Sequence, residues 1–479
     1  MTDRPPISDA FFNPGRVAVI GATNKLGFGF GVPKYLIEHG YRDRIYLINP
    51  KQTELFGQPV YPSITDVPAE IDLAIVVTPA PIIPEIIAGC LEKGVRSIII
   101  ESAGFSETGP EGRQLERTIS DMVAGTSTRI IGPNCVGVVN PHNGFATTEI
   151  SFAELKPGHI AVVAQSGVFG NILMDWAPTQ NLGLSKVITI GNRLDVDECD
   201  VLAYLAEDET TRVIALYMEG VKDGARFLKT ARRVAGIKPV IILKSGRTEA
   251  GSAATASHTG SLAGNDLIYS GIFRQCGLIR ANNFLEMFDM AKAFATQPIP
   301  SEPTVAVVTS SGSLGAMTTD ACISLGLNLP SFPKEAVNKI SSRAPAWMNI
   351  RNPVDVGPSG LFGPAMATAM ETAAMNSFIL IPVLPQMVLQ EMKEADKNMD
   401  MSTWLGDIRE IRRKYPEKPV ITVTLGSHVW MQLIRDFLGD EMPILNTPEN
   451  AARAVAELYN FGLRRQSPFG GVFPDSPFK

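Results

Sequence analysis

Cysteine is scarce in this sequence, and the few cysteines present are isolated from one another. The 479 residues include only five, with no Cys-x-x-Cys pair: Cys90, Cys135, Cys199, Cys276 and Cys322. An odd number of scattered cysteines predicts neither a disulfide framework nor a zinc site, and we expect no metal site in this chain. The pattern is typical of a protein from a reducing compartment.

The sequence also lacks a basic stripe and a long apolar run. Its formal net charge is −6 and 19% of its residues are charged, which argues against a nucleic-acid partner. The most apolar internal run, residues 378–389, is interrupted by Pro382 and Pro385 and is shorter than the ~20 residues of a membrane helix. Residues 1–14 have no apolar core of the kind found in secretory signals. We therefore expect a cytoplasmic protein that does not bind membranes.

What the sequence contains throughout is an alternation of short β-branched runs with longer amphipathic stretches. This alternation is typical of βαβ units, and a chain of 479 residues is too long for a single core. We predict an α/β fold with three open, mostly parallel, doubly wound sheets. The expected strands are residues 17–20, 45–48, 73–77, 97–100 and 129–131, then 160–163, 186–190, 213–216 and 240–243, and finally 304–308, 378–381 and 420–424.

Two stretches of unusual composition indicate where the sheets are separated. A polar segment rich in Thr and Ser follows Pro141, and three prolines occur within residues 297–303. We therefore expect domains at residues 1–145, 146–298 and 299–462. Residues 463–479 show no periodic pattern and are predicted to form an irregular tail.

Each unit opens in the same way, with an apolar strand that runs into small residues and then a helix. The openings are Val19-Ile-Gly-Ala-Thr23, Val163-Ala-Gln-Ser-Gly167 and Val308-Thr-Ser-Ser-Gly-Ser313. Such a turn places the free N–H groups of a helix N-terminus at the carboxyl edge of a sheet, where anions bind, although plain helix capping would use the same residues. In the second and third units, the candidate phosphate-binding residues are Ser166, Gly167, Ser311, Gly312 and Ser313.

The first opening is rich in glycine and invites a dinucleotide interpretation. A nicotinamide site usually has Asp or Glu at the end of the second strand, where this chain has Asn49-Pro50-Lys51. A lysine there suits the extra phosphate of coenzyme A better than a free ribose, so a dehydrogenase is disfavoured. A plain tight turn with a solvated lysine is the simpler alternative. The candidate CoA-binding residues are Gly21, Ala22, Thr23, Asn24, Lys51, Thr78 and Pro79.

A segment of almost entirely small residues, 245–257, follows an expected strand and leads to His258. Because nothing in it is large enough to be anchored in a core, we predict a mobile loop that carries the imidazole. Such a histidine can take a phosphoryl group from one donor and present it to another acceptor. A phosphohistidine also needs an acceptor at its second ring nitrogen, and Glu219, at the carboxyl end of a strand, is the candidate. A surface histidine and a solvated glutamate are the simpler alternative.

Three further polar residues lie on loops after expected strands: Asn192, Asp195 and Asp355. We predict that they border the acyl substrate, with turn and cap roles as the alternative.

The order of these motifs resembles the nucleoside-diphosphate-forming acyl-CoA synthetases, relatives of succinyl-CoA synthetase. The segments that carry the resemblance are the glycine turn, Gln165-Ser-Gly-Val-Phe-Gly170, Gly191-Asn-Arg193, Tyr217-Met-Glu-Gly220, Lys244-Ser-Gly-Arg-Thr248 and Ser257-His-Thr-Gly-Ser-Leu262. The resemblance implies a Rossmann-like CoA-binding domain followed by two flavodoxin-like ligase domains. It also implies that His258 carries a phosphoryl group between a nucleoside triphosphate and a small carboxylic acid, with Glu219 as its partner. The acyl phosphate then reacts with CoA.

The family's ATP-grasp unit has no counterpart in the sequence. The resemblance therefore implies the α subunit of a hetero-oligomeric acid–CoA ligase, with ATP or GTP and Mg²⁺ bound by an ATP-grasp β subunit. A departure from the family lies in Thr309-Ser-Ser-Gly-Ser-Leu-Gly315, where the family often has consecutive glycines. The alternative is a non-catalytic acyl-CoA-binding or regulatory protein of the same fold.

Overall fold

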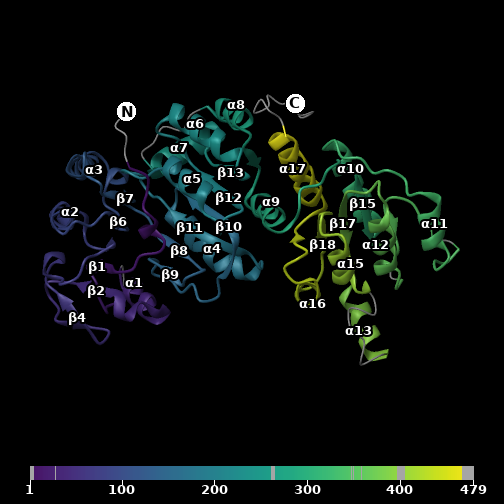
Figure 1. Ribbon diagram of the computed structural model, residues 1–479, viewed down its shortest axis with the longest axis horizontal. Coiled ribbons are helices and arrows are strands. Elements are labelled where there is room, and N and C mark those ends of the chain that lie inside the picture. Colours follow the sequence, from purple (N-terminus) through teal and green to yellow (C-terminus); the bar gives the residue numbers. More distant parts are fainter. Residues whose placement is uncertain are drawn as a thin grey trace. The chain divides into compact units, whose positions relative to one another are not determined.

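The computed structural model describes residues 5–26, 29–259, 265–346, 348, 350–357, 359–395 and 405–466. The chain forms two compact units, Met1–Ala281 and Asn282–Lys479. The first unit contains two sheets and the second contains one (Figure 1). All three sheets are open and mostly parallel, so the predicted fold class is confirmed.

The first sheet has seven strands in the order β3-β4-β2-β1-β5-β6-β7. Every neighbouring pair is parallel except β3 with β4. Strands β1, β5 and β6 are buried along their whole length, because helices cover both faces, and this explains their continuous apolar sequence. The strands are β1 (Val17–Ile20), β2 (Ile45–Ile48), β3 (Glu54–Leu55), β4 (Gln58–Tyr61), β5 (Leu73–Val76), β6 (Ser97–Ile100) and β7 (Arg129–Ile131), and the helices are α1 (Gly31–Leu36), α2 (Ile83–Glu92) and α3 (Pro110–Val123).

The second sheet, drawn in blue to teal in Figure 1, also has seven strands, in the order β14-β13-β12-β10-β11-β8-β9. Five of them are parallel, and β8 and β9 add an antiparallel edge. The strands are β8 (Val138–Asn140), β9 (Phe145–Ala146), β10 (Lys156–Ala164), β11 (Gly183–Thr189), β12 (Val213–Met218), β13 (Val240–Lys244) and β14 (Ile279–Ala281). The helices are α4 (Gly167–Thr179), α5 (Glu198–Glu207), α6 (Gly224–Ala235), α7 (Glu249–Thr259) and α8 (Asp266–Cys276).

A buried ion pair joins the two sheets of the first unit. Arg129, in β7, donates from Nε to Asp195 Oδ2 at 2.9 Å, and the Ile130 amide donates to the same oxygen at 2.8 Å. Arg129 also pairs with Asp200, at the start of α5, at 3.2 Å. The structure thus gives Asp195 a different place from the one we predicted. It is held at the junction of the sheets and does not line the cavity described below.

The second unit has a fully parallel sheet in the order β16-β15-β17-β18-β19. Its strands are β15 (Val305–Thr309), β16 (Val354–Asp355), β17 (Ser377–Ile381), β18 (Val420–Val423) and β19 (Ile444–Leu445). Its helices are α9 (Phe284–Thr296), α10 (Gly312–Ser324), α11 (Lys334–Ser341), α12 (Phe362–Glu371), α13 (Gln386–Ala395), α15 (Ile408–Lys414), α16 (His428–Leu438) and α17 (Pro448–Gln466). Among the helices of the described segments, none is long and apolar enough to cross a membrane.

The domain boundaries that we expected from the sequence differ in three places from the sheets and units of the structure. Strand β8, which begins at Val138, already belongs to the second sheet, although the expected boundary is at residue 145. Helix α9 belongs to the second unit and packs on α17 through Phe294 and Phe461, whose ring centroids are 5.6 Å apart. Helix α17 continues to Gln466, beyond the expected start of the tail, and residues 467–479 lie outside the described part.

The segment that we predicted as a mobile loop, residues 245–257, is helical from Glu249 onward, and only residues 245–248 lie outside regular secondary structure. Helix α7 spans Glu249–Thr259 and therefore includes the backbone of His258. Thr248 caps its first turn by accepting from the Gly251 amide at 3.1 Å. Four alanines lie within the helix, and alanine has the highest helix propensity, so small side chains favoured a helix here instead of a loop.

Candidate functional site

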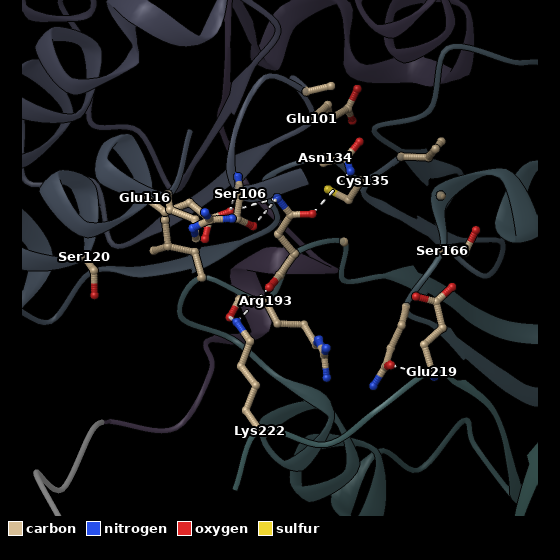
Figure 2. Close-up of a pocket in the computed structure, with 18 of the residues that line it drawn as sticks. Glu101, Ser106, Glu116, Ser120, Asn134, Cys135, Ser166, Arg193, Glu219 and Lys222 are labelled. Carbon is tan, nitrogen blue, oxygen red and sulfur yellow. Dashed lines mark hydrogen bonds between the residues drawn. The ribbon is translucent and has the colours of Figure 1, made fainter. Parts of the chain in front are cut away.

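A cavity of about 560 Å³ lies within the first unit, at the carboxyl ends of strands from both of its sheets. This volume falls within the ~300–1,000 Å³ typical of small-molecule sites. Figure 2 shows Ser166 and Glu219 at the right of the cavity, Ser106 and Glu116 at the left, and Glu101 at the top. The predicted residues Ser166, Gly167, Asn192 and Glu219 line it.

Helix α4 opens onto this cavity with its N-terminus. Ser166 is the N-cap, and its hydroxyl accepts from the Phe169 amide at 3.5 Å. Gly167 packs so closely that an added Cβ would lie 2.9 Å from Val136 Cγ2. The first turn of a helix presents unpaired N–H groups and a partial positive charge, so this end of the cavity is suited to a phosphate group.

Glu219 directly follows β12 and is fixed through its main chain by Gln165. The Gln165 side chain accepts from the amides of Glu219 at 2.7 Å and Gly220 at 3.0 Å, and it donates to the Gly220 carbonyl at 2.9 Å. The Glu219 side chain is 4% exposed and lines the cavity. Its carboxylate is therefore held close to the α4 N-terminus, since Gln165 immediately precedes Ser166.

The start of the His258 segment lies beside Glu219. Strand β13 pairs with β12, and the amide of Ser245, directly after β13, donates to the Met218 carbonyl at 3.0 Å. Burial raises the pKa of Tyr217, the Ser245 hydroxyl opposes this shift, and the neighbouring Glu219 carboxylate adds to it. The strand order thus brings the predicted partner of His258 to the edge from which α7 departs.

The loop after β11 forms the floor of the cavity. Arg193 has a φ of 57°, and its guanidinium donates to the Gly220 carbonyl at 2.7 Å and to Glu198 at 3.2 Å. Lys222 donates to the carbonyls of Asn192 at 2.8 Å and Arg193 at 2.7 Å. These contacts hold the loop in a conformation that is otherwise unfavourable for a residue with a side chain.

Asn192 forms part of the cavity wall, but its side chain is committed to other residues. Its amide nitrogen donates to Glu107 at 2.6 Å and Glu116 at 2.8 Å, and its oxygen accepts from Asn134 at 3.2 Å. Burial tends to raise the pKa of Glu107, but hydrogen bonds from Asn192 and from backbone amides lower it overall. The geometry therefore favours Asn192 as a residue that positions helix α3 against the second sheet.

The predicted CoA-binding residues gather at the carboxyl edge of the first sheet. Gly21 has a φ of 94°, and an added Cβ would lie 2.7 Å from Thr78 Cγ2. Asn49 donates to the Ala22 carbonyl at 2.9 Å and accepts from the Lys51 amide at 2.9 Å, so it joins the turns after β1 and β2. The Thr78 hydroxyl is buried without a hydrogen-bond partner among the described residues, as expected where a polar ligand binds. Thr23, Asn24 and Pro79 continue these turns.

The remaining predicted residues lie in the second unit and form a group of their own. Ser311 is the N-cap of α10 and makes no side-chain capping bond to the helix backbone, and its hydroxyl lies 3.1 Å from that of Ser313. An added Cβ at Gly312 would lie 2.8 Å from Asp355 Oδ2. The exposed Asp355 carboxylate therefore already lies against this helix end, where it would repel a phosphate.

Sequence reasoning missed several residues of the cavity. Gln165, Arg193 and Lys222 shape its floor through contacts to carbonyls and amides that are distant in sequence. Glu101, directly after β6, also lines it. Its position after a buried strand was the available signal, because carboxyl ends of parallel strands carry ligand-binding residues.

Comparisons with known proteins agree with this geometry. Residues 15–141 match the profile of the CoA binding domain, and residues 157–294 match that of the succinyl-CoA ligase like flavodoxin domain. The chain is 36% identical to the α subunit of ADP-forming acetate–CoA ligase I of Pyrococcus furiosus, over 95% of this chain and 97% of that subunit. The chain belongs to this α-subunit family. The resemblance inferred from the motifs is thereby confirmed.

Other members of the ADP-forming ligase family are longer or have a known structure. The ADP-forming acetate–CoA ligase of Methanocaldococcus jannaschii is 37% identical over 94% of this chain, which spans only 63% of that protein. The dinucleotide-forming acetyl-coenzyme A synthetase 1 of Ca. Korarchaeum cryptofilum, solved with phosphate and ADP, superposes with a TM-score of 0.86 at 28% identity. That match covers 95% of this chain and 97% of the other. The three-sheet architecture is thus shared along nearly the whole chain.

Proposed function

We propose that this chain is the α subunit of an ADP-forming acid–CoA ligase, and that it interconverts a carboxylic acid, CoA and phosphohistidine with acyl-CoA and phosphate. The observation that carries the proposal is the cavity in which the N-terminus of α4 and the carboxylate of Glu219 meet. The names of the relatives support acetate or another small carboxylic acid as the substrate.

In this proposal, each side of the cavity has a separate task. The first-turn N–H groups at Ser166 and Gly167 bind the phosphoryl oxygens and stabilise the negative charge that they carry. Glu219 accepts a hydrogen bond from one imidazole nitrogen of His258, so that the other nitrogen is free to carry the phosphoryl group. The side chain of His258 lies outside the described residues, and its approach to Glu219 is part of the proposal.

The chemistry then needs two displacements. The substrate carboxylate attacks the phosphorus of phosphohistidine, the N–P bond breaks, and an acyl phosphate forms. The CoA thiol next loses its proton to water or to the departing phosphate, its sulfur attacks the acyl carbon, the bond to the phosphate oxygen breaks, and phosphate leaves toward α4. The turns at Gly21 and Lys51 bind the phosphates of CoA, and the unpaired Thr78 hydroxyl supplies a donor or acceptor beside them.

The phosphoryl group must come from a nucleotide, and we propose that a separate chain binds it. The Methanocaldococcus jannaschii ligase is longer than this chain, whereas the Pyrococcus furiosus α subunit matches it nearly end to end. We infer an ATP-grasp β subunit that binds ATP or GTP with Mg²⁺, in a cytoplasmic hetero-oligomer. Ser311, Gly312 and Ser313 stay candidates for a second phosphate-binding helix end, and Asp355 stays a candidate substrate neighbour.

The experiment runs the reaction backwards without nucleotide. The purified chain is mixed with acetyl-CoA and labelled phosphate, and acid-labile label on histidine is measured. We expect label on the wild-type chain, none on His258→Ala, and unchanged labelling of His428→Ala, which removes an exposed histidine in α16. Absence of label with acetyl-CoA and with longer, branched, aromatic and dicarboxylic acyl-CoAs, even when a candidate β subunit is added, would overturn the proposal in favour of a non-catalytic acyl-CoA-binding protein.

A further inference from the structure

A buried lysine lies beside the strand end that leads to Glu219, and it has no task in the scheme above. Lys244 is the last residue of β13 and pairs in register with Met218, the last residue of β12. Its side chain is 2% exposed and does not line the cavity. A buried ammonium group costs stability unless it is well paired, so its partners indicate what it is for.

The ammonium group of Lys244 contacts the chain on both sides of His258. On the N-terminal side, Nζ donates a hydrogen bond to the carbonyl of Ser245, directly after β13. On the C-terminal side, Nζ lies 4.7 Å from the ring centroid of Tyr269, in α8. An ammonium group over an aromatic face is attracted by the ring, most strongly where water is excluded. One cation therefore joins the start of the His258 segment to the helix that follows it.

The two partners of Lys244 are in turn bound to the loop of Glu219. The Tyr269 hydroxyl accepts from the amide of Val221, two residues after Glu219, at 3.3 Å. The Ser245 amide donates at 3.0 Å to the carbonyl of the residue just before Glu219. Glu219 is thus flanked on each side by a contact to a residue that Lys244 holds.

Charged groups from three neighbouring elements act on this ammonium group. Burial lowers the pKa of Lys244, and Arg280, in β14, adds to this shift, whereas the carboxylates of Asp266, in α8, and Glu219 oppose it. The ammonium group therefore loses its proton at a lower pH than an exposed lysine. Burial raises the pKa of the Tyr269 phenol, so the ring stays neutral while Lys244 titrates.

We propose that Lys244 is a positioning residue for phosphoryl transfer, an inference that rests on the function proposed above. Its ammonium group holds the start of the His258 segment and helix α8 against the loop of Glu219, so that the imidazole meets the carboxylate. It also supplies a positive charge near that carboxylate, and a nearby cation favours the charged form of a buried acid. The lysine forms and breaks no covalent bond, and it acts through Ser245, Tyr269 and Glu219.

The half-reaction without CoA tests this role, because it involves only phosphoryl transfer to His258. The full chain is mixed with acetyl phosphate labelled in its phosphate, without nucleotide, and the rate of acid-labile labelling is measured at several acetyl phosphate concentrations. Lys244→Met keeps an unbranched apolar side chain and removes the charge. The maximal rate should fall on the order of tenfold, because a misplaced acceptor slows the transfer. The half-saturating concentration should stay within about twofold, because the helix end that binds the phosphate is unchanged.

The chain offers a matched control at the opposite end of the same strand. Lys238, two residues before β13, is half-buried and donates to the carbonyls of Leu205 at 2.7 Å and Asp208 at 2.6 Å. Burial lowers its pKa too. Lys238→Met removes similar contacts from the amino edge of the sheet, away from Glu219, and should leave the labelling rate within about twofold.

The pH dependence supplies a readout that a purely structural role would not change. An uncharged amine is not attracted to the Tyr269 ring, so the wild-type labelling rate should fall as the pH rises toward ~10. Lys244→Arg keeps its charge beyond pH ~12 and should retain most of the neutral rate without this alkaline decline. No CoA thiol is present in this half-reaction to titrate in the same range.

The outcomes distinguish this inference from the proposed function. Lys244 is not a positioning residue if Lys244→Met is labelled at the wild-type rate, if Lys238→Met is slowed as much, or if Lys244→Arg shows the wild-type alkaline decline. If the wild-type chain is not labelled by acetyl phosphate or by longer acyl phosphates, the proposed function itself fails. Thermal unfolding shows which variants are folded, and if Lys244→Met is not, the comparison of wild type with Lys244→Arg decides alone.

Discussion

The chain contains two helices, α4 and α10, that begin in the same way after a buried parallel strand, yet their N-termini have different surroundings. In the first unit, α4 opens onto a cavity of about 560 Å³ that is also lined by Glu219 and Glu101. In the second unit, the N-terminus of α10 is met by the Asp355 carboxylate. Similar local sequence therefore does not give the two helix ends similar surroundings, because the neighbouring loops decide which groups meet each N-terminus.

Each helix end is accompanied by a carboxyl group, and these two groups differ in burial. Glu101 is 3% exposed, whereas Asp355 is exposed to solvent. A buried carboxyl group without compensating cations favours its neutral form, while an exposed carboxylate next to a helix N-terminus is stabilised by the helix dipole. The first arrangement favours a protonated carboxyl group, and the second favours a charged one.

The largest expected difference between the N-termini of α4 and α10 is in reaction rate, when the first glycine of each helix is replaced by alanine. In Gly167→Ala the Cβ would lie 2.9 Å from Val136, so the first turn of α4 must shift, and acetyl-CoA formation from acetyl phosphate should fall on the order of a hundredfold. In Gly312→Ala the Cβ meets only the flexible Asp355 side chain, at 2.8 Å, and the same rate should change by about twofold at most. The test is the steady-state rate of acetyl-CoA formation, measured for both variants while the concentrations of acetyl phosphate and CoA are varied. Equal losses in the two variants would contradict the comparison.

The strands that hold these helix ends could be predicted from the sequence because they are buried on both faces. Runs such as Val17–Ile20 and Leu73–Val76 have no polar residue, and each forms a central strand. The short strands β8 and β9 and the helical state of residues 249–259 were missed. Strands of two or three residues are too short to show a pattern, and small side chains do not distinguish a loop from a helix.

The cavity could be predicted only in part, because its residues depend on contacts that are distant in sequence. The turn at Ser166 and the strand end at Glu219 were recognisable as local motifs. Asp195 follows a strand in the same way, but its partner Arg129 is 66 positions away, and only the fold reveals that pair. The same holds for Glu101, because only the fold shows that it is buried and lines the cavity.

A smaller effect is expected from the pH dependence of stability at Glu101. Its pKa is raised in the folded state, so between the unfolded and folded pKa values the folded chain binds more protons. The stability that this group contributes is full below the unfolded pKa of about 4.5 and is lost as the pH rises through the folded pKa, with a slope of up to about 1.4 kcal/mol per pH unit. Glu101→Gln lacks this titration and should gain stability relative to wild type as the pH rises. Urea unfolding across the pH range measures this, and parallel curves for the two proteins would contradict it.

The smallest expected effect distinguishes the two possible roles of the α10 end. Asp355→Asn removes a negative charge from a helix N-terminus, which should lower the free energy of unfolding by about 0.3–1 kcal/mol at low salt and by less at high salt. The same substitution removes a charge that would repel phosphate. If the N-terminus of α10 binds phosphate during the reaction, the KM for phosphate in the nucleotide-dependent assay with a β subunit should fall in Asp355→Asn. An unchanged KM together with the expected loss of stability would show that Asp355 only caps the helix, and that α4 is the phosphate-binding helix end of this chain.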